Sequence, residues 1–131
     1  MILITGGAGF IGSNFAIEYI KKHSNKTIIL DKLTYAGNIN NLNYIDEKKL
    51  TLIKGDISDS SLISKILKNY KPDKVINFAA ETHVDKSIVG PEKFIMTNIV
   101  GTYKLIDSIN LYYQNLNQNE KKNFIFLHVS T

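Results

Sequence analysis

The segment ILITGGAGFIGS (residues 2–13) runs from an apolar, strand-like stretch through a glycine-rich turn into a helical pattern. Gly7, Gly9 and Gly12 give the spacing G-x-G-x-x-G, and Gly6 in place of Gly7 gives G-x-x-G-x-x-G. Either spacing predicts a tight turn that brings bare backbone close to a ligand. The N–H groups at the start of the following helix would point at that ligand and suit an anion such as pyrophosphate.

An acidic residue follows this turn at a distance typical of a dinucleotide site. Asp31 lies 19 residues beyond Gly12, at the end of a predicted second strand. A carboxylate there accepts hydrogen bonds from the adenosine ribose hydroxyls and repels a 2′-phosphate, which favours NAD over NADP. Two alternatives stay open: Asp31 is an ordinary turn residue at a strand end, or the neighbouring Lys32 admits NADP.

Strand and helix patterns alternate along the whole chain. Apolar and β-branched runs predict strands over residues 2–5, 27–30, 50–53, 75–80 and 124–129. Helical patterns follow the glycine turn, Asp59 and Pro91, whereas residues 32–49 indicate an irregular connection with one helical turn and residues 114–122 a polar loop. The alternation predicts an α/β fold, a doubly wound parallel sheet in the order 3-2-1-4-5. We interpret residues 1–131 as one Rossmann-like domain, truncated after about five strands.

Helical periodicity also predicts apolar faces. In the first helix this face carries Ile11, Phe15 and Tyr19, with Ala16 and Ile20 alongside. In the long helix after Pro91 it carries Phe94, Ile95, Ile99, Tyr103, Ile106 and Ile109. Gly101 inside the long helix predicts close packing.

Composition narrows the possible functions. The chain has no cysteine, so disulfides, zinc–thiolate clusters and thiol nucleophiles are excluded. Its net charge of +4 comes from scattered lysines without arginine, which argues against nucleic-acid binding. No apolar run approaches the ~20 residues of a membrane span and no basic region precedes Ile2, so we expect a cytoplasmic protein. His23, His83 and His128 lack metal-ligand spacing, and no Gly-Lys-Ser/Thr of a P-loop follows the glycines.

Longer stretches resemble a known family. TGGAGFIG (residues 5–12) resembles the start of extended short-chain dehydrogenases/reductases, most of which modify nucleotide sugars. Within that family the nucleotide-sugar 4,6-dehydratases are similar to DKLTYAGN (31–38), AAETHVDKS (79–87), TNIVGT (97–102) and HVST (128–131). The first two of these stretches separate dehydratases from the 4-epimerases better than the glycine turn does.

The resemblance implies a role for each matching residue. Pyrophosphate contacts would come from Gly6, Gly9, Phe10, Ile11 and Gly12. The adenosine ribose would contact Asp31, Lys32, Leu33 and Thr34, and the adenine Asp56 and Ile57. The nicotinamide half would contact Phe78, Ala79, Ala80, Glu81, Thr82 and Thr97. Thr82, where serine is commoner in the family, and Thr131 would also contact the hexose.

The resemblance further implies an NAD-dependent lyase that acts on a nucleotide sugar as a homodimer formed through the long helix. NAD would accept a hydride from C4 of the sugar, water would leave across C5–C6, and the hydride would return to C6. The family's Asp-Glu pair and its catalytic Tyr-x-x-x-Lys pair follow the position of Thr131, so we expect no catalytic residue in this chain. We expect the chain alone to bind NAD weakly and to be inactive. A different dehydratase or epimerase of the family, or a non-catalytic dinucleotide-binding module, remains an alternative.

Overall fold

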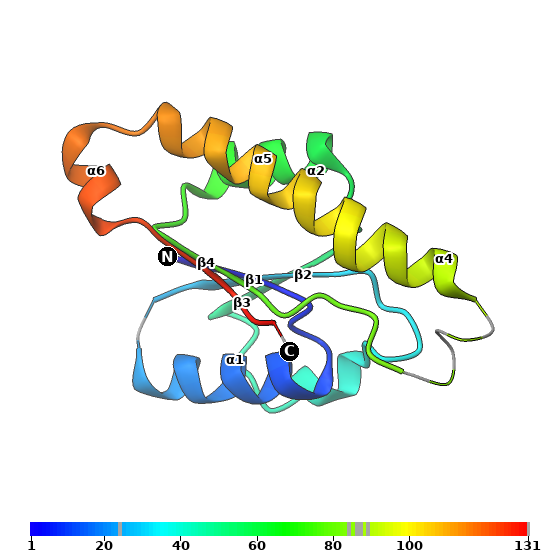
Figure 1. Ribbon diagram of the computed structural model, residues 1–131. Coiled ribbons are helices and arrows are strands. Elements are labelled where there is room, and N and C mark those ends of the chain that lie inside the picture. The colour runs from blue at the N-terminus through cyan, green and yellow to red at the C-terminus, as the bar shows by residue number, and fades with distance from the viewer. Residues whose placement is uncertain (24, 84, 86–87, 89, 131) are drawn as a thin grey trace.

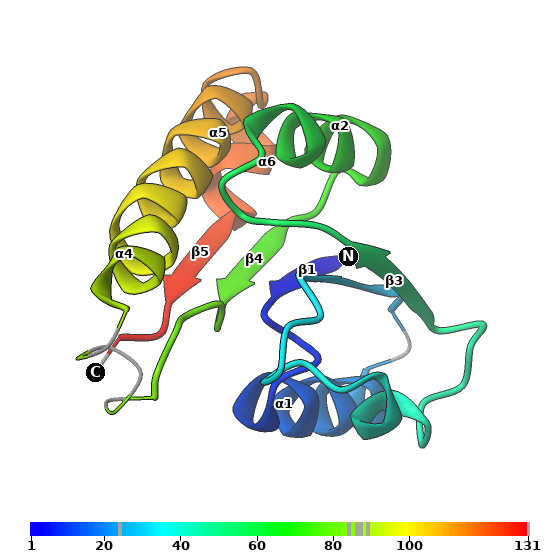
Figure 2. The same ribbon diagram turned by 90° about the vertical axis from the view of Figure 1, so that its right-hand side faces the viewer.

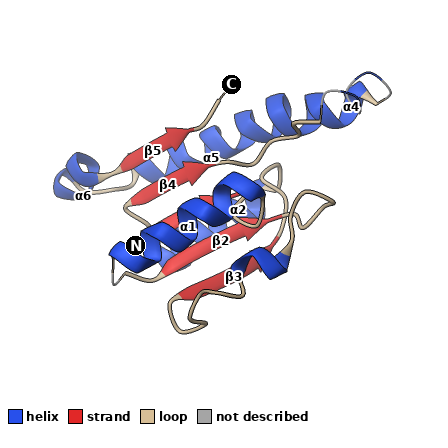
Figure 3. Ribbon diagram, turned by 90° about the horizontal axis from the view of Figure 1, so that it is seen from below, coloured by secondary structure: helices blue, strands red, loops and turns tan. Residues whose placement is uncertain are grey.

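Five parallel strands form one sheet in the order β3-β2-β1-β4-β5, which confirms the predicted topology (Figure 1). The computed structural model describes residues 1–23, 25–83, 85, 88 and 90–130. The strands are β1 (Ile2–Thr5), β2 (Thr27–Asp31), β3 (Leu50–Lys54), β4 (Lys74–Asn77) and β5 (Ile125–His128). Figure 3 shows them side by side, with β3 and β5 at the two edges of the sheet.

Helices cover both faces of this sheet (Figures 1 and 2). One face carries α1 (Phe10–Lys22) and the short 3-10 helix η1 (Ile39–Leu42). The other carries α2 (Ser60–Tyr70) and a continuous helical run made of α4 (Pro91–Phe94), the π-helical η2 (Ile95–Gly101) and α5 (Thr102–Gln114). The short α6 (Gln118–Asn123) precedes β5.

The central strand explains why both faces are covered. In β1, Leu3 points into the core beneath α2 and α5, whereas Ile2 and Ile4 point into the core beneath α1. All three side chains are fully buried. An unbroken apolar run of this kind is typical of a strand in a sheet that is buried on both sides.

The strand register brings the functional segments to one edge. Thr5 pairs with Leu30 of β2 and with Asn77 of β4, so these three strands end at the same level. The glycine turn, the Asp31 loop and the segment after Asn77 therefore leave the sheet together, beyond the carboxyl ends of the strands. Ligands of open parallel sheets bind at this edge.

The predicted apolar face of α1 is only partly correct. Ala16 and Ile20 are buried and Phe15 and Tyr19 are partly buried, but Ile11 is 63% exposed. The helix instead buries Gly12 and Ser13 in its first turn. This follows from the glycine turn, which packs the start of the helix directly against the backbone of the preceding loop.

The polar loop predicted over residues 114–122 is wrong, because α6 begins within it, at Gln118. The Asn117 side chain accepts hydrogen bonds from the N–H groups of Asn119 and Glu120, at 3.0 Å each. The Glu120 carboxylate in turn accepts one from the Asn117 N–H at 2.8 Å. This reciprocal capping box satisfies the free N–H groups that would otherwise disfavour so short and polar a helix.

The long helix differs from the predicted pattern in which side chains it buries. Leu105, which was not among the predicted apolar positions, and Ile109 are buried against the sheet. Ile99 and Tyr103 are 63% and 67% exposed. The predicted close packing at Gly101 is confirmed, because a Cβ atom there would lie 3.0 Å from Cγ1 of Ile57.

Candidate functional site

The glycine turn after β1 is shaped by two close backbone approaches. Gly6 has φ +71° and donates its N–H to the Leu30 carbonyl at 2.9 Å. A Cβ atom on Gly6 would lie 2.5 Å from the Ala79 nitrogen, and one on Gly12 would overlap the Gly6 carbonyl oxygen. Glycine is therefore required at both positions because a side chain has no space, and at Gly6 also because φ is positive.

Gly9 is different, because the space in front of it is open. The nearest atoms to a Cβ on Gly9 would be the Gly6 and Ala36 carbonyl oxygens, at 3.4 and 3.9 Å. Gly9 is also the N-cap residue of α1, whose first turn contains no acidic residue and receives no side-chain cap. Bare backbone and the positive end of a helix dipole together favour an anion at this point.

Asp31 links the glycine turn to the loop after β2. Its carboxylate is buried, and its two oxygens accept the Ala8 N–H at 2.9 Å and the Leu33 N–H at 2.8 Å. A Cβ atom on Gly37 would lie 2.5 Å from the Asp31 Oδ1 atom, so the loop folds closely over the carboxylate. Each carboxylate oxygen has a second lone pair and retains the capacity to accept a ligand hydroxyl.

Lys32 and Asp56 form an ion pair on the same wall of the site. The Lys32 Nζ and Asp56 Oδ2 atoms are 2.7 Å apart, and the Ser58 N–H donates to Asp56 Oδ1 at 2.8 Å. Burial alone would raise the pKa of Asp56, but these hydrogen bonds outweigh it and hold the pKa below its ordinary value. The ammonium group of Lys32, the residue that follows Asp31, is thus engaged by Asp56.

Asn77, at the end of β4, organises the centre of the sheet edge. Its Oδ1 atom accepts the Thr5 hydroxyl at 2.5 Å and the Ala79 N–H at 3.0 Å. Its Nδ2 atom lies 2.9 Å from Nδ1 of His128 on β5. One fully buried amide therefore joins three strands. Sequence reasoning missed Asn77, and the only available signal was a polar residue closing an apolar strand.

Glu81 is held by residues from two distant segments. Its N–H donates to Oδ1 of Asn98 at 2.8 Å, and its carbonyl accepts from Nδ2 of Asn98 at 2.9 Å. Its carboxylate accepts the Tyr35 hydroxyl at 2.7 Å, a hydrogen bond that raises the pKa of Tyr35. Sequence reasoning assigned no role to Asn98 or Tyr35, although both lie within the family-like stretches.

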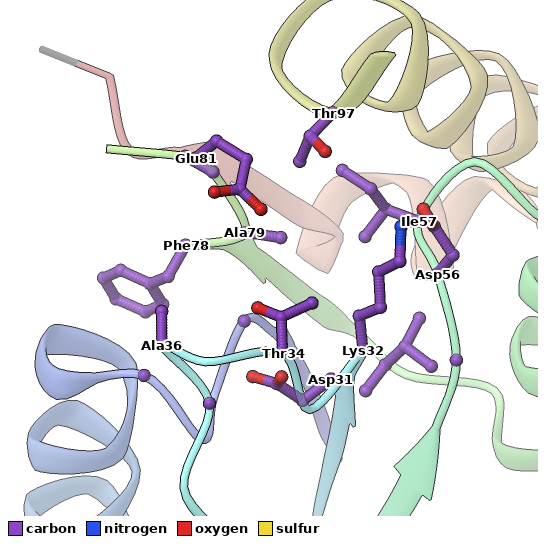
Figure 4. A pocket seen from close by; sticks show the side chains of 16 residues that line it. Asp31, Lys32, Thr34, Ala36, Asp56, Ile57, Phe78, Ala79, Glu81 and Thr97 are labelled. Carbon is purple, nitrogen blue, oxygen red and sulfur yellow. Dashed lines mark ion pairs between the residues drawn. The ribbon is translucent and has the colours of Figure 1, made fainter. Parts of the chain in front are cut away.

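These segments surround one cleft (Figure 4). The residues that line it and that the sequence predicted are Gly6, Gly9, Asp31, Lys32, Thr34, Asp56, Ile57, Phe78, Ala79, Ala80, Glu81 and Thr97. The cleft is also lined by residues that the sequence did not predict, namely Leu30, Ala36, Gly37 and Gly55. In Figure 4 the Asp31–Ala36 wall faces the Phe78–Glu81 wall, with Thr97 above and Asp56 to one side.

Six predicted residues are not among those that line the cleft. Gly12 and Leu33 lie behind it as part of the turn and loop backbone. Phe10 and Ile11 are 81% and 63% exposed at the start of α1, and Thr82 is an exposed residue just after Glu81. Thr131 lies outside the described residues.

The spacing Tyr-x-x-x-Lys does occur twice in the chain, but neither pair lines the cleft. Tyr44, which precedes Lys48, is 87% exposed in the connection before β3. Tyr70, which precedes Lys74, ends α2 and packs on the core. Lys74 begins β4, at the opposite end of the strand from the cleft. Neither tyrosine is placed to act on a ligand in the cleft.

Within the described ranges, no group of three or more His, Asp or Glu side chains is arranged to hold a metal ion. None of the helices described there is long and apolar enough to cross a bilayer. The cleft is therefore the candidate binding site, because it combines a helix start that can accept an anion with a buried carboxylate.

A protein-family comparison agrees with this geometry. The family model for GDP-mannose 4,6 dehydratase matches residues 3–131. The chain belongs to this family.

Relatives of known activity are close in sequence. Over 130 residues the chain is 47% identical to a dTDP-glucose 4,6-dehydratase of Xanthomonas campestris, and over 131 residues it is 49% identical to one of Salmonella typhimurium. The alignments cover 98% and 99% of this chain but only 37% and 36% of the two relatives. The chain thus spans little more than a third of the length of these family members.

Solved structures of the family share the fold. A dTDP-glucose 4,6-dehydratase of Bacillus anthracis in complex with NAD matches 99% of this chain and 37% of its own, with a TM-score of 0.81 and 36% identity. One from Streptomyces venezuelae, with NAD bound, matches 82% of this chain and 34% of its own, with a TM-score of 0.77 and 42% identity. A UDP-glucose 4-epimerase of Thermotoga maritima is more distant, at 32% identity and a TM-score of 0.76, covering 85% of this chain and 34% of its own.

Proposed function

We propose that this chain is the NAD-binding part of a dTDP-glucose 4,6-dehydratase. The observation that carries the proposal is the open backbone at Gly9, placed at the start of α1 and beside the buried Asp31 carboxylate in one cleft. NAD supplies the two chemical groups that this arrangement favours, a pyrophosphate anion and ribose hydroxyls. The relatives and solved structures of this activity support the same assignment.

The cleft suggests an orientation for the cofactor. In this proposal the pyrophosphate lies against Gly6 and Gly9, which line the cleft. The main-chain N–H groups of Phe10, Ile11 and Gly12, in the first turn of α1, would complete its surroundings. The adenosine ribose lies at residues 31–34 and the adenine at Asp56 and Ile57. The nicotinamide lies between Phe78–Thr82 and Thr97. Thr82 and Thr131 would contact the hexose, which remains the prediction from family resemblance.

The proposed reaction is the removal of water from dTDP-glucose to give dTDP-4-keto-6-deoxyglucose. When bound, NAD supplies the hydride acceptor for the sugar carbon that is oxidised. The residues of this chain bind the cofactor and fix its orientation. Because the chain spans about a third of its relatives, we assign the proton-transfer groups and most sugar contacts to a longer protein and expect the chain alone to be inactive.

Two properties of the whole protein complete the proposal. We infer a homodimer, because Ile95, Ile99, Tyr103 and Ile106 form an exposed apolar face along the long helix. We also infer a cytoplasmic location, which the absence of cysteine from the sequence supports. The partner molecules in this proposal are a nucleotide sugar and a second copy of the chain.

Titration of the chain with NAD in a calorimeter tests the cofactor assignment. We expect weak but saturable binding by the wild type and a loss of at least about tenfold in Gly9→Val, because the added side chain enters the open space. The Cβ atom of that side chain would be no closer than 3.4 Å to its nearest neighbour. The matched control is Lys22→Val, which adds the same side chain at an exposed position in the last turn of α1. An absence of saturable NAD binding by the wild type, or equal affinities of the two variants, contradicts the proposal.

A further inference from the structure

The wall of the cleft at Phe78–Glu81 is an irregular segment that leaves the sheet after β4. Its first half is anchored, because Phe78 donates its N–H to the Thr5 carbonyl at 2.8 Å and Ala79 donates to the Asn77 side chain. Because β4 ends at Asn77, no strand pairing holds the backbone at Glu81, which depends on hydrogen bonds from other segments.

Asn98 supplies those contacts from the long helix. Its side-chain amide accepts the Glu81 N–H at 2.8 Å and donates to the Glu81 carbonyl at 2.9 Å. A primary amide that makes both bonds to one residue satisfies the backbone as a neighbouring strand would. Among the twenty side chains only asparagine and glutamine carry such a donor and acceptor pair, and glutamine is one methylene longer.

The position of Asn98 connects this clamp to the cleft itself. Asn98 lies in the π-helical segment η2, directly after Thr97, which lines the cleft. Gly101 of the same segment packs against Ile57 on the adenine side of the cleft. The segment η2 is therefore seated at one end by Gly101 and reaches the opposite wall through Asn98. Irregular helical turns of this kind are frequent at functional sites.

We propose that Asn98 is a positioning residue for the nicotinamide end of the site, acting through the main chain of Glu81. The inference rests on the proposed function, because that assignment places the nicotinamide between the Glu81 wall and Thr97. Asn98 preforms this wall before the cofactor binds, whereas the pyrophosphate and adenosine contacts are formed by other segments. Loss of the Asn98 amide should weaken binding of the nicotinamide half selectively.

A comparison of NAD with ADP-ribose tests this selectivity, because ADP-ribose lacks the nicotinamide but keeps the pyrophosphate and adenosine. We expect Asn98→Ala to lower the affinity of the chain for NAD about fivefold and that for ADP-ribose less than twofold, as two partly exposed hydrogen bonds are lost. Asn115→Ala is the matched control, since Asn115 bonds the Leu111 carbonyl near the far end of the same helical run. It should change neither affinity.

Hydrogen exchange without any ligand provides an independent readout. The Glu81 amide should exchange faster in Asn98→Ala than in the wild type or in Asn115→Ala, while the strand amides of β1 and β4 keep their protection. Asn98→Asp keeps an acceptor for the Glu81 N–H but sets an acceptor-only carboxylate oxygen against the Glu81 carbonyl. Its NAD affinity should therefore be no higher than that of Asn98→Ala.

Each outcome of these measurements has one meaning. Equal losses for NAD and ADP-ribose, or unchanged Glu81 exchange in Asn98→Ala, overturn the positioning role. An unchanged NAD affinity in Asn98→Ala overturns it as well. Failure of the wild type to bind either ligand instead contradicts the proposed function itself, and is distinguished by being present before any substitution is made.

Discussion

Single residues define the chemistry of the cleft, and the ion pair made by Lys32 bears on which cofactor the cleft accepts. The sequence places a lysine beside Asp31, which leaves NADP as an alternative cofactor. In the structure the Lys32 ammonium is 2.7 Å from the Asp56 carboxylate. The charge of Lys32 is therefore engaged by the carboxylate of Asp56, which also lines the cleft. This pairing favours the NAD assignment without excluding the lysine from cofactor contact.

The Lys32–Asp56 pair predicts a pH dependence of stability. Hydrogen bonds from Lys32 and Ser58 outweigh burial and lower the folded-state pKa of Asp56, so the pair stabilises the fold above the ordinary carboxyl pKa of about 3.9. That contribution is lost as the pH falls through the lower folded-state value. Asp56→Asn should reduce the free energy of unfolding at pH 7 by up to about 1 kcal/mol, with a smaller difference at pH 3.

Urea unfolding of the wild type and Asp56→Asn across this pH range provides the measurement. Asp107→Asn, at an exposed position of α5, serves as the control and should follow the wild type throughout. If the difference in unfolding free energy between the wild type and Asp56→Asn grows towards pH 3, the pKa of Asp56 is not lowered by folding.

At the scale of elements, the contact between the glycine turn and the first turn of α1 sets the shape of the site. Gly12 packs on the Gly6 carbonyl, and Gly6 in turn packs on the backbone at Ala79. Three segments, one of them after β4, thus meet without side chains between them. The start of α1 is held beside the cleft, which Gly6 and Gly9 line.

Substitution of Gly12 tests this contact. In Gly12→Ala the new methyl group would overlap the Gly6 carbonyl oxygen, and backbone on both sides cannot yield as a flexible side chain would. We expect a loss of about 1–3 kcal/mol in unfolding free energy, as for other overpacked sites. Gly9→Ala should cost much less, because its methyl group would be no closer than 3.4 Å to its nearest neighbour. Thermal unfolding of both variants measures the difference. Equal melting temperatures of Gly12→Ala and Gly9→Ala would refute the close packing at Gly12.

Much at this scale could be predicted from the sequence. The strand order and the position of Asp31 followed from patterns that depend only on local periodicity and spacing. Asn77 and Asn98 could not be found in this way, because their bonds join residues brought together by the tertiary fold. The exposure of Ile11 escaped prediction because the first turn of α1 packs through Gly12 and Ser13 instead. The helix α6 had a stronger local signal that could have been used, the Asn-x-x-Glu capping box at Asn117.

At the scale of the whole molecule, the long helix carries an exposed apolar face that packs on no other described element. Ile99 and Tyr103 are the most exposed apolar side chains on it. Of the apolar positions predicted on this helix, Ile109 is buried in the domain, whereas Ile99 and Tyr103 are exposed. Periodicity alone does not distinguish a face buried in the domain from one that meets a partner.

The proposed homodimer gives a test of that surface. The wild-type chain should self-associate in sedimentation velocity at micromolar concentrations, and Ile99→Lys should remain a monomer, because a charge would be buried at the contact. Tyr44→Lys is the matched control, since Tyr44 is 87% exposed on the other side of the sheet from this helix. Persistence of the dimer in Ile99→Lys, or its loss in Tyr44→Lys, would assign the contact to another surface.

The central place of β1 in the sheet has a consequence for biosynthesis. Residues 2–5 leave the ribosome well before β4, yet β4 is their neighbour on one side, and its Asn77 pairs with Thr5 across 72 residues of sequence. During translation the glycine turn therefore waits until β4 has emerged before its backbone has a fixed surface to pack on. Contacts of such long sequence separation form slowly. A segment that is made before β4 therefore acquires its final structure only after β4 has been made.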